Sequence, residues 1–273
     1  MWKLHEAAAI ALLFVGCGIE PSDTDGLSSA QNAITYGHPD GSAHPSVGAL
    51  MYTLDGGATW WPHCSGTMVS ARVFLTAGHC TQPVLVYLTY GNYGVNLNPD
   101  AREAQSSDML LGQAFVHPDY RATTQETHDD YGVVVLDADV AVAPSALPAL
   151  GQLDSMNATN GLKGMEFTAV GYGYGGYING PGGKVPDEGP NLIRSVAVGT
   201  FASLTPDRLH ISQNPATGDG GTCDGDSGGP NFIGDTNVIA SITSTGEMYC
   251  RATNVGLRAD TASAQSFIRQ FIE

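Results

Sequence analysis

Short hydrophobic runs separated by turn residues recur along the chain from residue 34 onward. The runs are rich in valine, isoleucine, threonine and tyrosine, which favour strands, and glycine, proline, asparagine and aspartate lie between them. The clearest predicted strands are 84–90, 133–136, 167–170, 193–198 and 238–243. Strands do not alternate with long helical patterns, so the sequence predicts an all-β fold.

Two segments depart from this strand pattern. Four apolar residues recur at helical spacing near the end of the sequence, so we expect a helix over 261–272 that docks one apolar stripe on the body. The glycine-rich segment 170–183 is too flexible for a helix and is predicted to be a strand end that runs into a mobile loop.

The first 17 residues have the layout of an export signal, with one lysine, an apolar run and small residues before Cys17. The letters LFVGC that end at Cys17 resemble a bacterial lipoprotein box and predict a lipid on that cysteine; an ordinary signal peptide is the alternative. The apolar run is far shorter than the roughly 20 residues of a membrane-spanning helix. Residues 18–33 are polar and rich in turn residues, and we expect a linker or propeptide there.

Composition and charge exclude several classes of protein. The 273 residues are 42% hydrophobic and only 14% charged, with 35 glycines and 15 prolines, which suits one or two globular domains rich in turns. Eleven Lys and Arg against 27 Asp and Glu give a net charge of −16, which repels a phosphate backbone. We therefore expect no nucleic-acid partner.

Five cysteines leave one unpaired if the chain forms disulfides, and Cys17 has a separate explanation. The other four suffice for two disulfides, which implies an oxidising compartment. Zinc is the alternative, because His63-Cys64 and His79-Cys80 repeat a pair of ligand residues. Their spacing matches no common structural zinc pattern, and we expect no metal.

The strongest chemical motif is CDGDSGGP at 223–230, where glycines around Ser227 let backbone N–H groups approach a reacting carbonyl. Ser227 is the candidate nucleophile, and it needs a base. His79 in the segment TAGHC is the candidate base, and the other histidines are expected to be surface or structural. Asp130, directly before a predicted strand, is the candidate orienting acid; Asp129 is the alternative, and the register to the strand favours Asp130.

Ser227 also fits Gly-x-Ser-x-Gly, the nucleophile elbow of α/β-hydrolases. That fold places its histidine after the serine, whereas the last histidine here is His210. The subtilisin order needs an aspartate before the histidine, and none upstream of His79 has comparable surroundings. The order His79, Asp130, Ser227 therefore remains.

The segments TAGHC, Asp-x-x-Val-Val-Val-Leu and CDGDSGGP, in this order, resemble the chymotrypsin/trypsin family of serine peptidases. Segments 34–37, 64–70, 116–120 and 170–173 are also similar to that family. The resemblance covers about 34–273 and implies two six-stranded antiparallel Greek-key β-barrels, with the active site between them. It also implies a serine endopeptidase that acts through an acyl-enzyme and needs no cofactor.

The same resemblance implies a role for each residue. Ser227 attacks the scissile carbonyl, His79 transfers its proton, and Asp130 holds His79. The backbone N–H groups of Gly225 and Ser227 would form the oxyanion hole. The implied disulfides are Cys64–Cys80 and Cys223–Cys250.

Activation is implied as well, because the family pairs the carboxylate at the position of Asp226 with a new α-ammonium, here that of Ile34. This predicts a zymogen that is cut before Ile34. No lysine or arginine precedes that bond, so we expect another protease or self-cleavage rather than a trypsin-specific activator. If Cys17 carries a lipid, the same cut releases the catalytic body.

The substrate pocket is expected to be open and uncharged. Trypsin-type members have an aspartate six residues before the nucleophile, but here that residue is Gly221. Apolar or aromatic side chains should therefore fit better than lysine or arginine. The alternative is a basic side chain, because Asp219, Asp224 and Glu247 lie close in sequence and could bind it by another route. The candidate pocket residues are Gly221, Thr222, Ser244, Thr245, Gly246 and Gly256.

We expect a monomer that is secreted, extracellular or periplasmic, and that touches a membrane only through a lipid on Cys17. Polypeptide substrates and protein inhibitors are the expected partners. Two alternatives remain: a catalytically silent binding protein on the same fold, and an esterase that uses the same nucleophile.

Overall fold

The computed structural model describes residues 34–82, 93–123, 127–180, 183–186 and 191–272. The chain divides into two units, Met1–Ala30 and Gln31–Glu273, and all described residues belong to the second. The predicted export signal, the whole predicted propeptide and the strand expected over 84–90 lie outside the described residues.

Six antiparallel strands close into a first barrel in the order β2-β3-β4-β9-β6-β5. The strands are β2 (Val47–Tyr52), β3 (Trp61–Met68), β4 (Val73–Ala77), β5 (Tyr93–Asn96), β6 (Leu110–Val116) and β9 (Tyr131–Leu136). Strand β9, with the sequence YGVVVL, pairs with β4 and β6 and is buried along most of its length. A run of β-branched residues of this kind favours a buried central strand.

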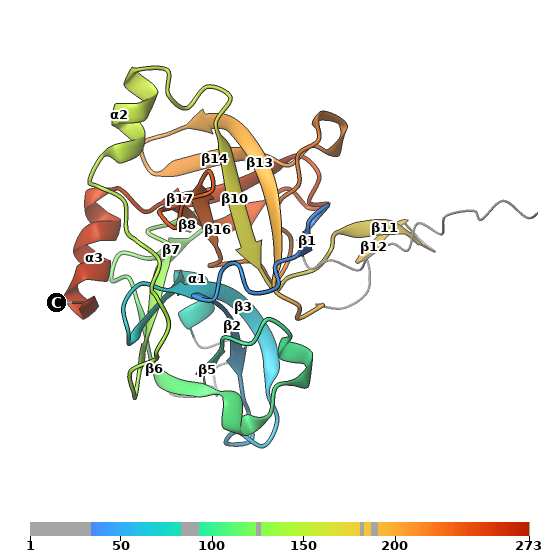
Figure 1. The fold of residues 1–273 in the computed structure, drawn as a ribbon, viewed down its shortest axis with the longest axis vertical. Helices are drawn as coiled ribbons and strands as arrows, with labels where there is room; N and C mark the ends of the chain where they lie inside the picture. Colours follow the sequence, from blue (N-terminus) through green and yellow to red (C-terminus); the bar gives the residue numbers. More distant parts are fainter. Residues whose placement is uncertain (1–33, 83–92, 124–126, 181–182, 187–190, 273) are drawn as a thin grey trace, which may run out of the picture. The chain divides into compact units, whose positions relative to one another are not determined.

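The second barrel has the order β13-β10-β15-β16-β17-β14, and a β13–β14 pairing closes it. Its strands are β10 (Glu166–Gly171), β13 (Ser195–Leu204), β14 (Arg208–Ser212), β15 (Pro230–Ile233), β16 (Ile239–Gly246) and β17 (Thr253–Arg258). The short strand β1 (His38–Pro39) adds to the outside of β13. The prediction of two six-stranded antiparallel barrels is thus confirmed (Figure 1).

Buried and partly exposed residues alternate along strand β14, and this alternation shows which of its residues face the core of the second barrel. In β14, Leu209 and Ile211 are buried, while the residues between and beside them are partly exposed. This period of two is what a half-buried strand requires. The predicted strands 133–136, 167–170 and 238–243 overlap β9, β10 and β16, whereas the strand predicted from residue 193 begins at Ser195.

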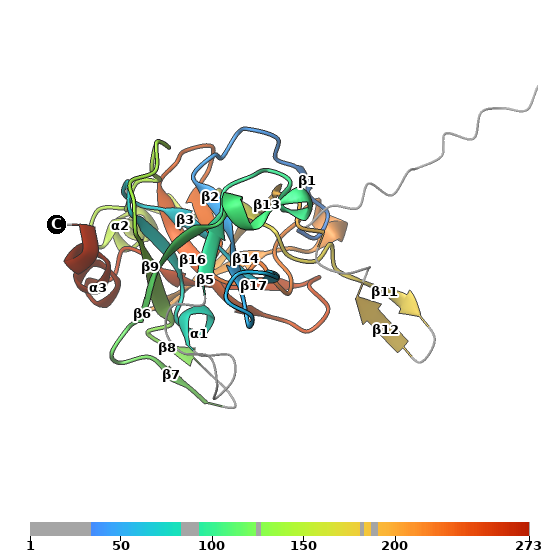
Figure 2. The same cartoon turned by 90° about the horizontal axis from the view of Figure 1, so that it is seen from below.

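Two small hairpins lie outside the barrels. They are β7 (Arg121–Ala122) with β8 (Thr127–His128), and β11 (Tyr177–Gly180) with β12 (Gly183–Pro186). Figures 1 and 2 show the β11–β12 hairpin standing out to one side of the barrels. It corrects the expectation that segment 170–183 is loop after its first strand, because Tyr177–Gly180 pair with Gly183–Pro186.

The helices are short except for the last one. They are α1 (Gly78–Thr81), α2 (Gln152–Ala158) and α3 (Ala262–Ile272), with 3₁₀ turns at Ala101–Glu103, Ser106–Asp108 and Pro215–Thr217. Helix α3 confirms the predicted terminal helix; α2 was not expected from the sequence. Within the described ranges, no helix is long and apolar enough to cross a bilayer.

Helix α3 packs against the first barrel although it follows the last strand of the second. Its Phe267 ring lies 5.0 Å from the ring of His117, and its Phe271 ring lies 4.9 Å from that of Phe115. Aromatic pairs at such distances contribute beyond the area they bury. The helix thereby helps to hold the two barrels together.

A buried arginine makes a second connection between the barrels. Arg194, directly before β13, is 1% exposed, and its guanidinium donates to Asp40 Oδ2 at 2.8 Å. It also donates to the backbone carbonyls of Val47 at 3.1 Å and Leu97 at 3.2 Å, both in the first-barrel half of the chain. A buried cation with this many acceptors is fully paired, so it fixes the barrels at one spacing.

Candidate active site

His79 lies in the short helix α1, which directly follows strand β4, beside Asp130 at the start of β9. The pairing of Ala77 with Tyr131 brings the two residues together. The backbone N–H of His79 donates to Asp130 Oδ1 at 2.7 Å, and its ring Nδ1 lies 2.9 Å from Asp130 Oδ2. A carboxylate bound in this way fixes both the position and the tautomer of the imidazole.

A third group contacts the same carboxylate. The hydroxyl of Ser244 donates to Asp130 Oδ2 at 2.5 Å. Burial raises the pKa of the Asp130 carboxyl, but the hydrogen bonds from His79 and Ser244 outweigh burial and leave the pKa below its usual value. Asp130 is fully buried and remains ionised. The carboxylate of Asp129 instead accepts from Ser263 at 2.5 Å, at the start of α3.

Ser227 comes from the second barrel, on the loop before β15, and its loop packs on the first barrel. The backbone N–H of Ser65 in β3 donates to the carbonyl of Ser227 at 2.9 Å. A Cβ atom added to the neighbouring Gly228 would lie 2.1 Å from Thr76 Oγ1, at the end of β4, and Gly228 has φ +79°. Only glycine allows this approach.

The loop that carries Ser227 therefore packs against Thr76, three residues before His79. Among the described residues, no hydrogen bond joins the Ser227 hydroxyl to the His79 ring. Such contacts often tighten only when substrate is bound, so the position of the two residues still suits a nucleophile and its base.

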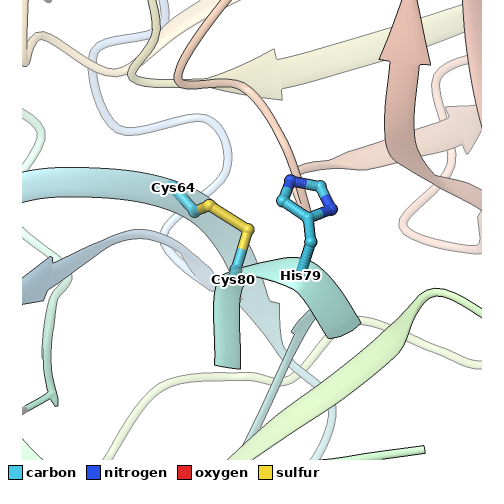
Figure 3. Close-up of side chains that lie close together, drawn as sticks. All are labelled: Cys64, His79 and Cys80. Carbon is cyan, nitrogen blue, oxygen red and sulfur yellow. A yellow bond between two sulfur atoms is a disulfide. The ribbon is translucent and has the colours of Figure 1, made fainter. Parts of the chain in front are cut away.

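The two disulfides join Cys64 to Cys80 and Cys223 to Cys250, the pairing that the family resemblance implies. Figure 3 shows the first of these bridges beside the imidazole of His79. Ligand atoms of Cys64, His79 and Cys80 lie within 4.8 Å of one another. Because both sulfurs are bonded to each other, neither is a thiolate ligand for zinc. The bridge instead holds α1 against β3.

Asp226 is the second fully buried aspartate near the candidate nucleophile. Its Oδ1 accepts from the backbone N–H of Gly173 at 2.8 Å, and its Oδ2 accepts from that of Cys223 at 2.9 Å. Burial raises the pKa of Asp226 to about 7, although the two backbone hydrogen bonds act against burial. No ion pair of the described part of the chain includes this carboxylate.

Ile34 is linked to this carboxylate through the backbone of residues 173 and 174. Its side chain is buried in a small cluster with Ala169 and Ala197. Its backbone N–H donates to the carbonyl of Tyr174 at 3.2 Å, and Tyr174 directly follows the Gly173 that donates to Asp226. Ile34 has φ +76°, a left-handed conformation that is strongly unfavourable for a β-branched residue.

The predicted pocket residues do not all face one space. Ser244 points to Asp130, and a Cβ atom on Gly256 would lie 2.3 Å from the Ser241 hydroxyl. Thr245 and Gly246 are exposed at the end of β16. The Ser244 side chain therefore supports the aspartate, and the assignment of Ser244 to the substrate pocket stays a prediction.

Gly221 and Thr222 are covered by a side chain that the sequence did not single out. A Cβ atom on Gly221 would lie 2.3 Å from Gln213 Oε1, and that oxygen accepts the backbone N–H of Thr222 at 2.9 Å. Gln213 is 1% exposed, and its Nε2 has no partner in the structure. An uncharged amide thus occupies the place that a side chain at Gly221 would take.

A cavity of about 210 Å³ lies beside the candidate oxyanion residue Gly225. The lining residues are Pro62, His63, Cys64, Tyr172, Tyr174, Leu192 and Gly225. Burial, with a smaller contribution from the charge of His79, lowers the pKa of His63 to about 4, so this histidine is neutral at pH 7. No sequence motif indicated that His63 lines a cavity.

Two closed antiparallel barrels, with a histidine–aspartate pair beside a glycine-flanked serine, define the class of protein as chymotrypsin-like serine peptidases. The family model for trypsin matches residues 41–268, and the chain belongs to the trypsin family. It is a serine endopeptidase, a hydrolase that acts on polypeptides.

Two curated relatives agree with this assignment. Chymotrypsin of Phaedon cochleariae is 29% identical over 208 residues, which cover 75% of this chain and 70% of that protein. Brachyurin of Leptuca pugilator is 26% identical over 204 residues, which cover 66% of this chain and 80% of that protein. A solved structure entitled "Atomic resolution structure of HBP" has a TM-score of 0.63 at 19% identity, covers 87% of this chain and 96% of its own, and supports the fold alone.

Proposed function

We propose that this peptidase cleaves polypeptides with a His79, Asp130 and Ser227 triad and is made as a zymogen that is cut before Ile34. The observation that carries the triad is the pair of contacts from His79 to the buried Asp130, at 2.7 and 2.9 Å. A paired imidazole of this kind serves as a general base when a serine hydroxyl lies beside it.

In the proposed reaction, Ser227 Oγ attacks the scissile carbonyl carbon while His79 takes the hydroxyl proton. The tetrahedral oxyanion accepts hydrogen bonds from the backbone N–H groups of Gly225 and Ser227. His79 then gives its proton to the leaving amine, and an acyl-enzyme ester on Ser227 remains. Water, deprotonated by His79, attacks the ester, and His79 returns the proton to Ser227 Oγ as the acyl bond breaks and the new carboxylate leaves.

The proposed activation rests on Asp226 and Ile34. A fully buried carboxylate without a cation is unfavourable, and the pKa of Asp226, raised to about 7, reflects this. Cutting the bond before Ile34 creates an α-ammonium close to Asp226. The cut also removes the φ torsion of Ile34, and with it the strain of a left-handed β-branched residue. Both effects favour the cut form.

We propose that residues 34–273 form the catalytic domain, residues 18–33 the propeptide and residues 1–17 an export signal. Export agrees with the two disulfides, because such bridges persist in oxidising compartments. Lipidation of Cys17 rests on its sequence context alone. A secreted monomer that meets polypeptide substrates and protein inhibitors is the state we propose.

For the substrate, we propose an uncharged side chain on the acyl side of the cleaved bond. The support is Gln213, whose amide fills the space over Gly221 and leaves no room for a carboxylate on that residue. Because the residue at position 221 is glycine and carries no carboxylate, lysine and arginine lose the ion pair that a trypsin-type pocket offers them at this position.

The test uses the chain with residues 29–33 replaced by Asp-Asp-Asp-Asp-Lys, so that enteropeptidase releases Ile34 as the amino terminus. A peptide library should be cleaved after uncharged residues, and Ser227→Ala should abolish cleavage. Hydrolysis of simple esters with all peptides left intact would favour the esterase. Cut chain that neither hydrolyses substrate nor reacts with a sulfonyl fluoride would favour the silent binding protein.

A further inference from the structure

Ser65 in strand β3 is a fully buried serine at the contact between the two barrels. Its hydroxyl donates to the backbone carbonyl of Gly225 at 3.0 Å. Its backbone N–H donates to the carbonyl of Ser227 at 2.9 Å. One residue of the first barrel thus holds the carbonyl oxygens of both residues whose N–H groups form the proposed oxyanion hole.

The direction of the Ser65 hydroxyl is fixed by a third contact. The backbone N–H of Tyr172 donates to Ser65 Oγ at 3.0 Å. Because an N–H only donates and a carbonyl only accepts, the hydroxyl proton must point to Gly225 O. The hydroxyl therefore uses both its donor and its acceptor capacity, and no other rotamer of Ser65 would keep both hydrogen bonds.

Backbone contacts extend this arrangement along the turn that carries the oxyanion donors. Behind Tyr172, the N–H of Gly173 donates to Asp226 Oδ1 at 2.8 Å, and that of Tyr174 donates to the carbonyl of Asp224 at 2.8 Å. Successive N–H groups of 172–174 thus bind Ser65 and the turn 224–226. Ser65 is the member of this set that lies in the first barrel.

The packing around Ser65 leaves little room for another conformation of its side chain. A Cβ atom on Gly171 would lie 3.1 Å from Ser65 Oγ, and one on Gly229 would lie 3.3 Å from Ser65 Cβ. Gly225 itself has φ +91°, a conformation that glycine reaches easily and also leaves easily. The turn needs an outside restraint to keep one orientation, and the Ser65 hydroxyl supplies it.

We propose that Ser65 is a positioning residue for the oxyanion hole, acting through the carbonyl of Gly225. This inference rests on the proposed function, since it assumes that the N–H groups of Gly225 and Ser227 bind the oxyanion. The Gly225 carbonyl belongs to the peptide bond with Asp226, and the Gly225 N–H to the peptide bond with Asp224, so the Ser65 hydroxyl acts on the donor across the two torsions of Gly225. Without that hydroxyl these torsions are less restrained, and the Gly225 N–H binds the oxyanion less well. The loss falls on the transition state, while binding of the uncleaved substrate is preserved.

The test compares Ser65→Ala and Ser65→Gly with unaltered sequence, all cut before Ile34. We expect kcat to fall by about 10- to 100-fold with KM nearly unchanged, because deleting a whole oxyanion donor costs about 100- to 1,000-fold and here the donor is only loosened. The affinity for a peptide boronic acid, which forms a tetrahedral adduct on Ser227, should fall by the same factor. The affinity for the product peptide should not change.

Thr67→Val is the matched control. Thr67 lies two residues further along β3, is equally buried, and its hydroxyl lies 2.8 Å from Ser145 Oγ, away from the 223–230 loop. This variant should lower the melting temperature and leave both kcat and the boronic acid affinity unchanged.

Each outcome has a distinct meaning. If Ser65→Ala and Ser65→Gly keep the kcat and boronic acid affinity of the unaltered enzyme, the inference is wrong while the triad stands. It is also wrong if product affinity falls as much as boronic acid affinity, since that indicates general disruption. If the unaltered cut enzyme is inactive and unlabelled at Ser227, the proposed function itself fails.

Discussion

Asp130 and Asp226 are both fully buried, lie on either side of the candidate nucleophile, and differ in their electrostatics. Side chains of His79 and Ser244 contact Asp130, and its pKa lies below the usual value despite burial. Within the part of the chain that the structure describes, Asp226 accepts only from backbone N–H groups, and burial raises its pKa to about 7. Although the two carboxyl groups are equally buried, the pKa of Asp130 is lowered, which favours its charged form, and the pKa of Asp226 is raised, which favours its neutral form.

The difference indicates that one half of the site is complete before processing and the other is not. The His79–Asp130 half contains the partners that keep its carboxylate ionised. Among the described residues, no cation pairs with Asp226, and this half adjoins the turn that carries the proposed oxyanion donors. Processing before Ile34 should consequently change oxyanion binding and leave the base and its orienting acid as they are.

The largest expected effect comes from disrupting the pair of His79 and Asp130. Asp130→Asn in the cut enzyme should lower kcat by about 10,000-fold, because the amide stabilises the wrong tautomer of His79. Binding of a peptide boronic acid to the same turn should be less affected than kcat. A kcat within tenfold of the unaltered enzyme would remove Asp130 from the mechanism.

Asp226→Asn should have a smaller effect on kcat, and that effect should depend on whether the chain has been cut before Ile34. We expect the cut enzyme to lose about 100- to 1,000-fold in kcat, the range for loss of one oxyanion donor. The uncut chain should hardly change, because its Asp226 has no cation to lose. Equal losses in the two forms, measured with one peptide substrate, would contradict the activation scheme.

Removing one support of Asp130 sharpens the comparison further. Ser244→Ala takes away the hydroxyl that donates to Asp130 Oδ2 at 2.5 Å. A hydrogen bond to a charged group contributes about 1.5 to 3 kcal/mol, so kcat should fall by about tenfold or somewhat more. Kinetics of the cut enzyme test this, with Thr67→Val as the control, because the Thr67 hydroxyl contacts Ser145 and not Asp130.

The smallest effect concerns the pH dependence of stability in the uncut chain. Because folding raises the pKa of Asp226 from 3.8 to about 7, its contribution is full below pH 3.8 and is lost as pH rises to about 7. Asp130, whose pKa is lowered, contributes above pH 3.8 and loses its contribution in more acidic solution.

Urea unfolding of the uncut Ser227→Ala chain between pH 4 and 8 measures this dependence. Adding Asp226→Asn should remove the part of the decline that lies between pH 4 and 7. Identical pH profiles of the two chains would show that the Asp226 carboxyl does not titrate as proposed.

The sequence alone predicted the two barrels, the disulfide pairing and the residues around TAGHC and CDGDSGGP, because each depends on local residue types or on a family motif. The supporting contacts of Ser65, Ser244 and Gln213 were not predictable. Each depends on a distance between residues 9 to 160 positions apart in the chain. Helix α2 and the β11–β12 hairpin were missed because short elements carry little periodicity.

Covalent labelling before and after processing tests the central claim most directly. An organophosphonate should react with Ser227 of the chain cut before Ile34, with the adduct located by mass spectrometry, and much more slowly with the uncut chain. Ser227→Ala should abolish labelling in both forms. Equal rates in the two forms, or an adduct on another residue, would contradict the proposal that an unpartnered Asp226 keeps this peptidase inactive until it is cut.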